Sequence, residues 1–444
     1  MKKISLILIL SIVYITNIDA QAKWSLRQCI DYAIENNIDI RQQALNVKNE
    51  EINVSTSKNS RLPNLNASAS QNFNFGRALS QRTNTYETNS MSSTSFGVST
   101  SMPVFTGFRI PNETKAKELD LKAAIESLNK AKDNMQLNVA SYFLDVLFKK
   151  EILKMYEEQV LLTKLQVERT EILVTSGKVP ESQLYDVKAQ QAKDELNVTT
   201  STNDLSLSLL NLAQILNIQD VENFDIEEPL LDNIVADNLS SIMPVDQVYQ
   251  TSLGIKPVVK EAEYRLQSSQ RNLKVAQSGY WPTLDIGASY NNGFDHVYNN
   301  NDNISPSTQL SRNGREGIGL TLNIPLFNRF QTRNQVRAAR LNIENQQLTL
   351  DNIKLALYKE IQQAYQSAIA AQAKFTSTEK AHEAADEAFK YAQERYNIGK
   401  STAFEFEEAQ TKLLTSKSEQ LQAKYDFLFR AKILDFYNGK EIDI

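Results

Sequence analysis

The residues of this chain that could do chemistry are carboxylates, because the usual metal ligands and nucleophiles are scarce. The sequence has two histidines and a single cysteine, Cys29. Zinc and haem sites are built largely from these residue types, so neither kind of site is expected. The sequence also has no nucleophile elbow, phosphate-binding glycine loop or metal-ligand spacing. These absences disfavour an enzyme and indicate no cofactor.

Two short glycine turns carry the carboxylates of most interest. The turn IGKSTAFEFEE holds Glu405 and Glu408, which are three positions apart and hence share one face of a helix. The turn SGKVPESQLYD ends on Asp186. Carboxylates at such turns could attract cations. However, Thr402 and Glu405 also fit a capping box, and acidic residues in a first turn stabilise a helix. Both interpretations stay open.

The first 22 residues are expected to be an export signal. Lys2 and Lys3 supply positive charge, residues 4–15 form an apolar run, and Ala20-Gln21-Ala22 offers a cleavage site after Ala22. An exported protein with one cysteine has no internal disulfide, so packing must stabilise the fold. Later stretches fall short of the roughly 18 apolar residues of a spanning helix, whereas alternating membrane strands would escape such a search. The net charge of −5, without clusters of Lys and Arg, disfavours nucleic acid as a partner.

The elements that position the two turns are repeated. The segment RLPNLNASAS returns as YWPTLDIGASY, and SFGVSTSMPVFTGFR returns as GIGLTLNIPLFNRF. Pro103 and Gly177 are 74 residues apart, as are Pro325 and Gly399. Equal spacings in such different sequences indicate two structural repeats, residues 23–216 and 245–437.

Each repeat is expected to contain a helix, two strands, a very long helix, a glycine turn and another helix. The expected helices span residues 24–58, 111–176, 180–216, 245–279, 330–398 and 402–437. The expected strands span residues 64–76, 92–105, 283–294 and 316–327, with polar loops at 76–91 and 291–316. Apolar and small or polar residues alternate along all four strands. A soluble pair of β-hairpins packed on helices would show the same alternation.

The long helices determine the expected architecture. Neither 330–398 nor 112–176 contains glycine or proline, so each would be on the order of 100 Å long at 1.5 Å per residue. Their apolar residues recur every three or four positions, which is typical of coiled coils. Residues 217–244 form an acidic, irregular connector, and 438–444 form a short tail. Four strands cannot close a barrel, so strands that enter a membrane require several chains to share one.

This order of elements resembles the TolC family of outer-membrane efflux proteins over roughly residues 24–437, including the opening segment WSLRQCIDYAIENNIDI. The resemblance implies an α+β membrane protein whose homotrimer forms a twelve-stranded barrel in outer-membrane lipid and a twelve-helix periplasmic tunnel. It implies a passive duct that works with a periplasmic adaptor and an inner-membrane pump of the RND or ABC type. The cargo could be drugs, metals or proteins. The alternative is a trimeric adhesin or structural stalk.

The resemblance also implies roles for particular residues. Glu405 and Glu408, with Asp186, would form an acidic ring at the periplasmic entrance, and Tyr396 would help to lock it. The family's arginine two positions after the second glycine is Ser401 here, which puts that lock in doubt. The hairpin tips that would dock the adaptor are Gly177, Lys178, Gly399 and Lys400. The helix–strand junctions are Pro63, Pro103, Pro282 and Pro325.

Overall fold

The computed structural model describes residues 23–79, 84–219, 221, 223–229, 243–298 and 303–442. The expected export signal at 1–22 and most of the connector at 217–244 therefore lie outside the described residues. The chain forms two compact units. One unit comprises the sheet and its adjoining helix segments, residues 46–125 and 261–351; the other comprises the remaining helices. We call them the sheet unit and the helical unit.

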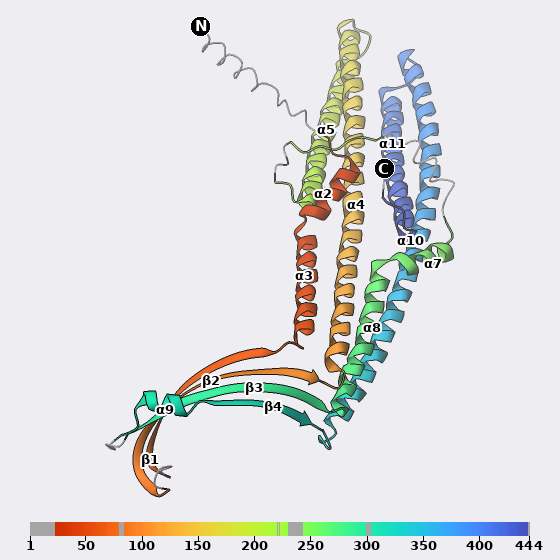
Figure 1. Ribbon diagram of the computed structural model, residues 1–444. Coiled ribbons are helices and arrows are strands. Elements are labelled where there is room, and N and C mark those ends of the chain that lie inside the picture. The colour runs from red at the N-terminus through yellow and green to blue at the C-terminus, as the bar shows by residue number, and fades with distance from the viewer. Residues whose placement is uncertain are drawn as a thin grey trace, which may run out of the picture. The chain divides into compact units, whose positions relative to one another are not determined.

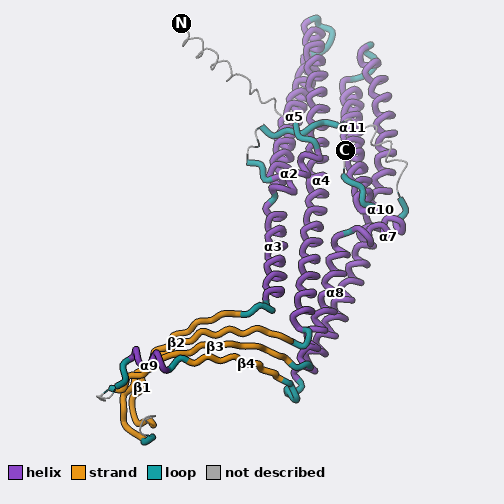
Figure 2. The backbone as a smooth tube through the Cα atoms, viewed as in Figure 1, coloured by secondary structure: helices purple, strands orange, loops and turns teal. Residues whose placement is uncertain are grey.

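The sheet unit contains four antiparallel strands in the order β1-β2-β3-β4. Their bounds are Asn64–Leu79, Tyr86–Phe105, Thr283–Val297 and Arg315–Asn323. The strands form one continuous curved sheet (Figures 1 and 2). The central contact joins β2 of the first repeat to β3 of the second, so the two predicted hairpins make a single sheet.

The register places the apolar residues of all four strands on one face. One row across the sheet consists of Leu65, Thr100, Ala288 and Ile318. The adjacent row, on the opposite face, consists of Asn64, Ser101, Gly287 and Gly319. The apolar face is largely open: Leu65 is 75% exposed and Ile318 is 84% exposed. An apolar face of this extent is suited to lipid or to a partner rather than to water. The predicted alternation is confirmed.

Several predicted strand bounds are wrong. The loop predicted at 76–91 is mostly strand, because β1 continues to Leu79 and β2 begins at Tyr86. The strand predicted to end at 294 continues to Val297, and the following loop contains a short helix, α9 (Pro306–Arg312). The strand predicted to reach 327 ends at Asn323, since Pro325 lacks the N–H that a ladder needs. Cross-strand pairing overrides the weak strand propensity of the Ser- and Asn-rich segments.

The helices predicted at 24–58 and 245–279 are each broken in two. The first consists of α2 (Leu26–Asn36) and α3 (Ile38–Asn59), because the side-chain oxygen of Asn37 accepts a hydrogen bond from Asp39 N at 2.9 Å and starts a new helix. The second consists of α7 (Val245–Ile255), α8 (Pro257–Gln277) and a 3₁₀ turn at Ser278–Tyr280. Its break falls at Lys256 because a residue before proline avoids the helical region.

Two long helical hairpins complete the chain. The first pairs α4 (Arg109–Thr175) with α5 (Glu181–Leu216), and the second pairs α10 (Gln331–Asn397) with α11 (Ala403–Tyr437). The apolar core of the helical unit includes Phe143, Leu216 and Leu428. Cys29 lies in this core, where burial raises the pKa of its thiol to about 12, so it packs as an apolar residue. None of the described helices combines the length and apolar character needed to cross a bilayer.

The four prolines predicted at junctions occupy different places. Pro63 and Pro282 directly precede β1 and β3. Pro103 lies inside β2, where the register to β3 shifts, and Pro325 lies just beyond β4. Each strand-to-helix turn then uses two residues with positive φ. They are Gly107 and Phe108 in the first repeat, and Arg329 and Phe330 in the second.

Gly107→Ala is expected to lower the free energy of unfolding by about 2 kcal/mol. The residue has φ +61°, and an added Cβ would lie 2.7 Å from the Ser278 carbonyl oxygen and 2.7 Å from Trp281 Cβ. The measurement is the thermal unfolding midpoint of the purified protein in detergent, followed by circular dichroism. Arg329→Gly is the matched control, since Arg329 already adopts φ +53° and glycine there should not lower the midpoint. An unchanged midpoint for Gly107→Ala would contradict this account of the turn.

Candidate functional site

The two hairpin tips end in the same backbone motif. Gly177 and Gly399 have φ of +70° and +71°. In the first tip, Gly177 N donates to Val174 O at 2.9 Å, and Lys178 N donates to Leu173 O at 2.9 Å. The second tip repeats both bonds, from Gly399 N to Tyr396 O and from Lys400 N to Arg395 O. This double bond pattern is a Schellman motif, which only a left-handed residue such as glycine completes without strain.

Glu405 fulfils its predicted capping role. Its carboxylate accepts hydrogen bonds from Ser401 Oγ at 2.6 Å and from Thr402 N at 3.3 Å, and its own N–H bonds Thr402 Oγ1. The guanidinium of Arg395 lies 3.9 Å away. The hydrogen bond from Ser401, followed by that from Thr402, lowers the pKa of Glu405. Glu405 is therefore an exposed, ionised carboxylate beside the second tip.

Glu408 lies one turn further along α11 and is also exposed. Its carboxylate forms an ion pair with Lys412 at 2.8 Å. An exposed pair of this kind contributes little to stability and leaves the carboxylate accessible to solvent ions. Glu405 and Glu408 belong to the first two turns of α11, so both carboxylates lie next to the second tip.

Asp186 approaches Glu407, a residue that the sequence analysis did not select. Glu407 is half-buried, and burial raises the pKa of its carboxyl, with further contributions from the negative charges of Asp186 and Asp194. The structure thus brings carboxylates of α5 and α11 together across the two hairpins. No sequence signal singled out Glu407, because its proximity to Asp186 depends on how the two hairpins pack.

Polar contacts join the two hairpins at their tips. Gln183 Nε2 of the first hairpin lies 3.5 Å from the hydroxyl oxygen of Tyr396, whose ring stacks on Phe406 within the second hairpin at 4.9 Å. Arg169 donates to the side chain of Asn397 and, at 3.4 Å, to its carbonyl oxygen. Arg169 was not predicted, because 228 positions separate it from its partner. Ser401, where the resemblance leads us to expect arginine, donates its hydroxyl to the Glu405 carboxylate, next to the Thr402 cap of α11.

The interiors of the two hairpins differ in polarity. In the first, buried Asp194 accepts hydrogen bonds from Thr163 Oγ1 at 2.6 Å, Gln159 Nε2 at 3.3 Å and Gln190 Nε2 at 2.9 Å. Its α5 seam continues through small polar residues, Ser201 and Ser208. In the second, aromatic and small apolar residues fill the interior: Ala371, Phe375, Ala423, Phe427 and Ala431.

The surfaces of the tips are accessible and partly apolar. A side chain built at Gly177 or Gly399 would meet nothing within 4 Å. Lys178 and Lys400 are exposed beside these glycines. Large apolar side chains nearby are also exposed, with Phe404 at 74%; the others are Ile172, Tyr185, Tyr391 and Ile398. In the described part of the chain, no cluster of three or more His, Cys, Asp or Glu residues could hold a metal ion.

Comparison with known families gives a match over most of the chain. The profile of the family described as Outer membrane efflux protein matches residues 29–217 and 248–439. Among curated proteins, the chain is 19% identical over 396 residues to Outer membrane efflux protein BepC of Brucella suis, covering 89% of this chain and 80% of that protein. It is 22% identical over 301 residues to Outer membrane protein TolC of Escherichia coli, covering 66% and 58%.

Solved structures show the same fold. The chain superposes on CusC with a TM-score of 0.74 at 16% identity, covering 94% of this chain and 92% of that one. It superposes on the outer membrane protein VceC of Vibrio cholerae with a TM-score of 0.73 at 18% identity, covering 93% and 96%. Both matches include the sheet and the paired long helices, so the predicted fold of the subunit is confirmed.

Proposed function

We propose, because this chain belongs to the outer membrane efflux protein family, that three copies form a passive duct fed by a periplasmic adaptor and an inner-membrane pump. The observation that carries the proposal is the four-stranded sheet, whose exposed apolar face continues across both repeats. Its outer strands, β1 and β4, each have one edge without a partner strand in the described chain. Open edges are not tolerated in hydrocarbon, so neighbouring copies would complete the pairing in one barrel. The relatives are named for efflux and export, which gives no support to an adhesin-like stalk.

The entrance of the duct is assigned to the hairpin tips. Glu405 and Glu408 bring two exposed carboxylates per chain, and the pair of Asp186 and Glu407 adds two more at the contact between hairpins. In a trimer these groups would concentrate negative charge in a narrow aqueous opening, which favours cations. Capping by Glu405 is compatible with this role, because the capping bonds keep its carboxylate ionised.

The adaptor is assigned to the same end of the helices. Lys178 and Lys400 lie on the glycine turns, and exposed apolar side chains such as Phe404 and Ile398 surround them. An apolar patch rimmed by charge is typical of a protein–protein contact. The tips therefore offer both the charged opening and the surface around which an adaptor would close.

The test is single-channel conductance in a planar bilayer. We expect the wild type to show a small, cation-preferring conductance, since the opening is narrow and acidic. A variant carrying Glu405→Gln and Glu408→Gln should lose most of that preference, and adding Asp186→Asn and Glu407→Gln should remove the remainder. Reversal potentials in a salt gradient measure the preference directly.

Glu419→Gln is the matched control, because Glu419 is an exposed carboxylate about three turns further along α11. It should leave the reversal potential unchanged. A wild type that inserts but never conducts would overturn the duct. Unaltered selectivity in the four-residue variant would retain the duct and reject this assignment of its entrance.

A further inference from the structure

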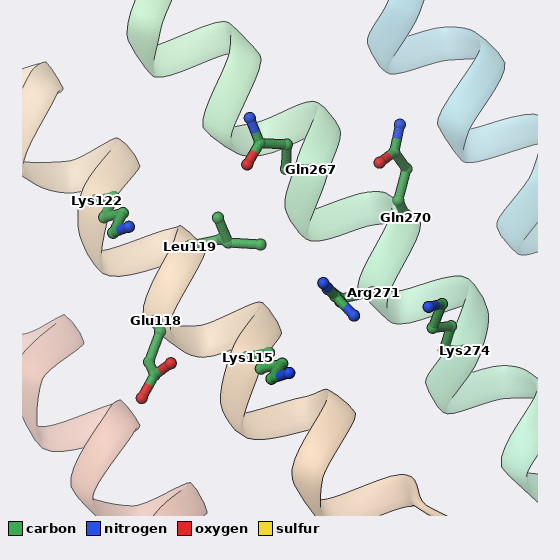
Figure 3. A pocket seen from close by; sticks show the side chains of 8 residues that line it. All are labelled: Lys115, Glu118, Leu119, Lys122, Gln267, Gln270, Arg271 and Lys274. Carbon is green, nitrogen blue, oxygen red and sulfur yellow. The ribbon is translucent and has the colours of Figure 1, made fainter.

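A groove between α4 and α8 in the sheet unit gathers positive charge. It has a volume of about 540 Å³, and its walls carry Lys115 and Lys122 from α4 and Arg271 and Lys274 from α8. Figure 3 shows these side chains on the two helices, with Leu119 projecting from α4 toward α8 and two further lining residues, Gln267 and Gln270, on α8. A single carboxylate, Glu118, also lines the groove.

The groove cations lack the carboxylate partners that their neighbours have, although Lys122 Nζ lies over the Tyr264 ring, 5.7 Å from its centre. Basic side chains on the same helices pair with carboxylates: Arg109 with Glu113, Lys117 with Asp120, and Arg265 with Glu261. Among the residues that the structure describes, no carboxylate pairs with any of the four groove cations. Glu118 is engaged by Lys58 at 2.8 Å, which leaves the groove with a surplus of positive charge. Like charges on facing helices repel, and a bound anion would relieve that repulsion.

A second cavity, on the α3 side of α4, lies at the end of the sheet. This second cavity, of about 480 Å³, shares Lys115 with the groove and is lined by Phe105, Phe108 and Arg61. Phe105 pairs with Leu284, which belongs to the apolar face of the sheet. Lys115 and Glu118 of α4 therefore line both the charged groove and the cavity that reaches the end of the apolar face.

An aromatic cluster marks the boundary between the charged groove and the apolar face. Phe108 makes edge contacts with Phe105 at 5.3 Å and with Trp281 at 6.4 Å, and both Phe108 and Trp281 are exposed. Exposed aromatic residues of this kind belong at the interface between hydrocarbon and headgroups. Lys115 lies seven residues beyond Phe108, and Lys274 lies seven before Trp281. At 1.5 Å per helical residue, these residues lie about 10 Å from the aromatic level, a few Å beyond a headgroup layer of about 5–7 Å. Long basic side chains can reach back over that distance to the lipid phosphates.

We propose that this groove binds the phosphate headgroup of an anionic phospholipid from the periplasmic leaflet, with the acyl chains lying on the apolar face. The inference rests on the proposed function only in placing the sheet in the membrane. Lys115, Arg271 and Lys274 hold the phosphate, and the glutamines donate hydrogen bonds to the headgroup. The lipid thereby fixes the depth at which the sheet sits in the bilayer.

The test uses the full-length protein in a neutral detergent, with phosphatidylglycerol and phosphatidylcholine as probes and native mass spectrometry to count retained lipids. The wild type should retain phosphatidylglycerol well above phosphatidylcholine. A variant carrying Lys115→Gln, Arg271→Gln and Lys274→Gln should bind phosphatidylglycerol on the order of a hundredfold more weakly. Inorganic phosphate at millimolar concentration should not displace the lipid.

The matched control carries Arg109→Gln, Lys117→Gln and Arg265→Gln, which remove three paired cations from the same helices. It should retain the lipid as the wild type does. Equal lipid binding by the groove variant, or displacement by phosphate alone, would overturn the proposal. Lipid retention is measured in detergent and does not require a conducting channel. A negative result would therefore reject the lipid site without rejecting the duct, which is tested by conductance in a bilayer. Circular dichroism verifies that each variant is folded.

Discussion

Replacing Arg169 by alanine is expected to raise the conductance of the resting duct. Arg169 holds Asn397 through two hydrogen bonds and so links the first hairpin tip to the second. At this exposed site the link contributes about 1 kcal/mol per chain. If three chains open together, the contributions sum to about 3 kcal/mol, and the open-to-closed ratio rises on the order of a hundredfold. Single-channel open probability in planar bilayers measures this ratio.

Lys188→Ala provides the control for the Arg169 variant. Lys188 pairs with Glu171 at 4.0 Å within the first hairpin, so its loss removes a charge without severing the contact between hairpins. Open probability should stay at the wild-type value. Gln183→Ala should also raise the open probability, but less than Arg169→Ala does. The hydrogen bond from Gln183 to Tyr396 is long and joins two uncharged groups, so its loss costs less. Equal open probability for all three variants and the wild type would show that these contacts do not hold the entrance.

Asp133→Ala is expected to destabilise the helical unit by about 3 kcal/mol. The Lys256 ammonium lies 3.5 Å from the Asp133 carboxylate and 3.2 Å from the centre of the Phe436 ring. The Lys256 side chain is 8% exposed and that of Asp133 is 27% exposed. Removing the carboxylate leaves a buried ammonium over the Phe436 and Tyr437 rings without its ion-pair partner. Thermal unfolding of the detergent-solubilised protein measures the loss.

The matched variant replaces both members of the pair, with Asp133→Leu and Lys256→Met. Burial lowers the pKa of Lys256 from 10.5 and raises the pKa of Asp133 from 3.8. The lysine shift contributes stability above pH 10.5 that is lost as pH falls through the folded pKa. The aspartate shift contributes stability below pH 3.8 that is lost as pH rises through the folded pKa. Between these limits the ionised pair carries its desolvation cost, so the double variant should match or exceed wild-type stability at pH 7. A double variant as unstable as Asp133→Ala would contradict this explanation.

Local sequence patterns predicted much of the fold. The alternation in each strand assigned the apolar face correctly, because a period of two fixes the side of every residue once one is known. The pairing of β2 with β3 was not predicted, since it joins residues such as Met91 and Val297 from different repeats. The helix break at Asn37 was missed because a helix-like apolar pattern continues through it, while the side chain of Asn37 starts a new helix.

The candidate site divides in the same way. Spacing located Gly177 and Gly399, because a left-handed residue that ends a helix must be placed at a fixed position. The contact of Arg169 with Asn397, and the influence of the Asp186 charge on Glu407, depend on how the two hairpins pack, and sequence separation hides them. The capping role of Glu405 is confirmed, and its place in an acidic ring at the entrance stays a prediction.

The pairing of β2 with β3 has a consequence for biogenesis. During export the first repeat emerges before the second. The edge of β2 is therefore unpaired, and its apolar face is uncovered, until more than a third of the chain has followed. Closing so long a loop is entropically costly and slow, and exposed edges of this kind invite aggregation. A nascent subunit therefore exposes the β2 edge and its apolar face until Thr283 and the residues after it arrive.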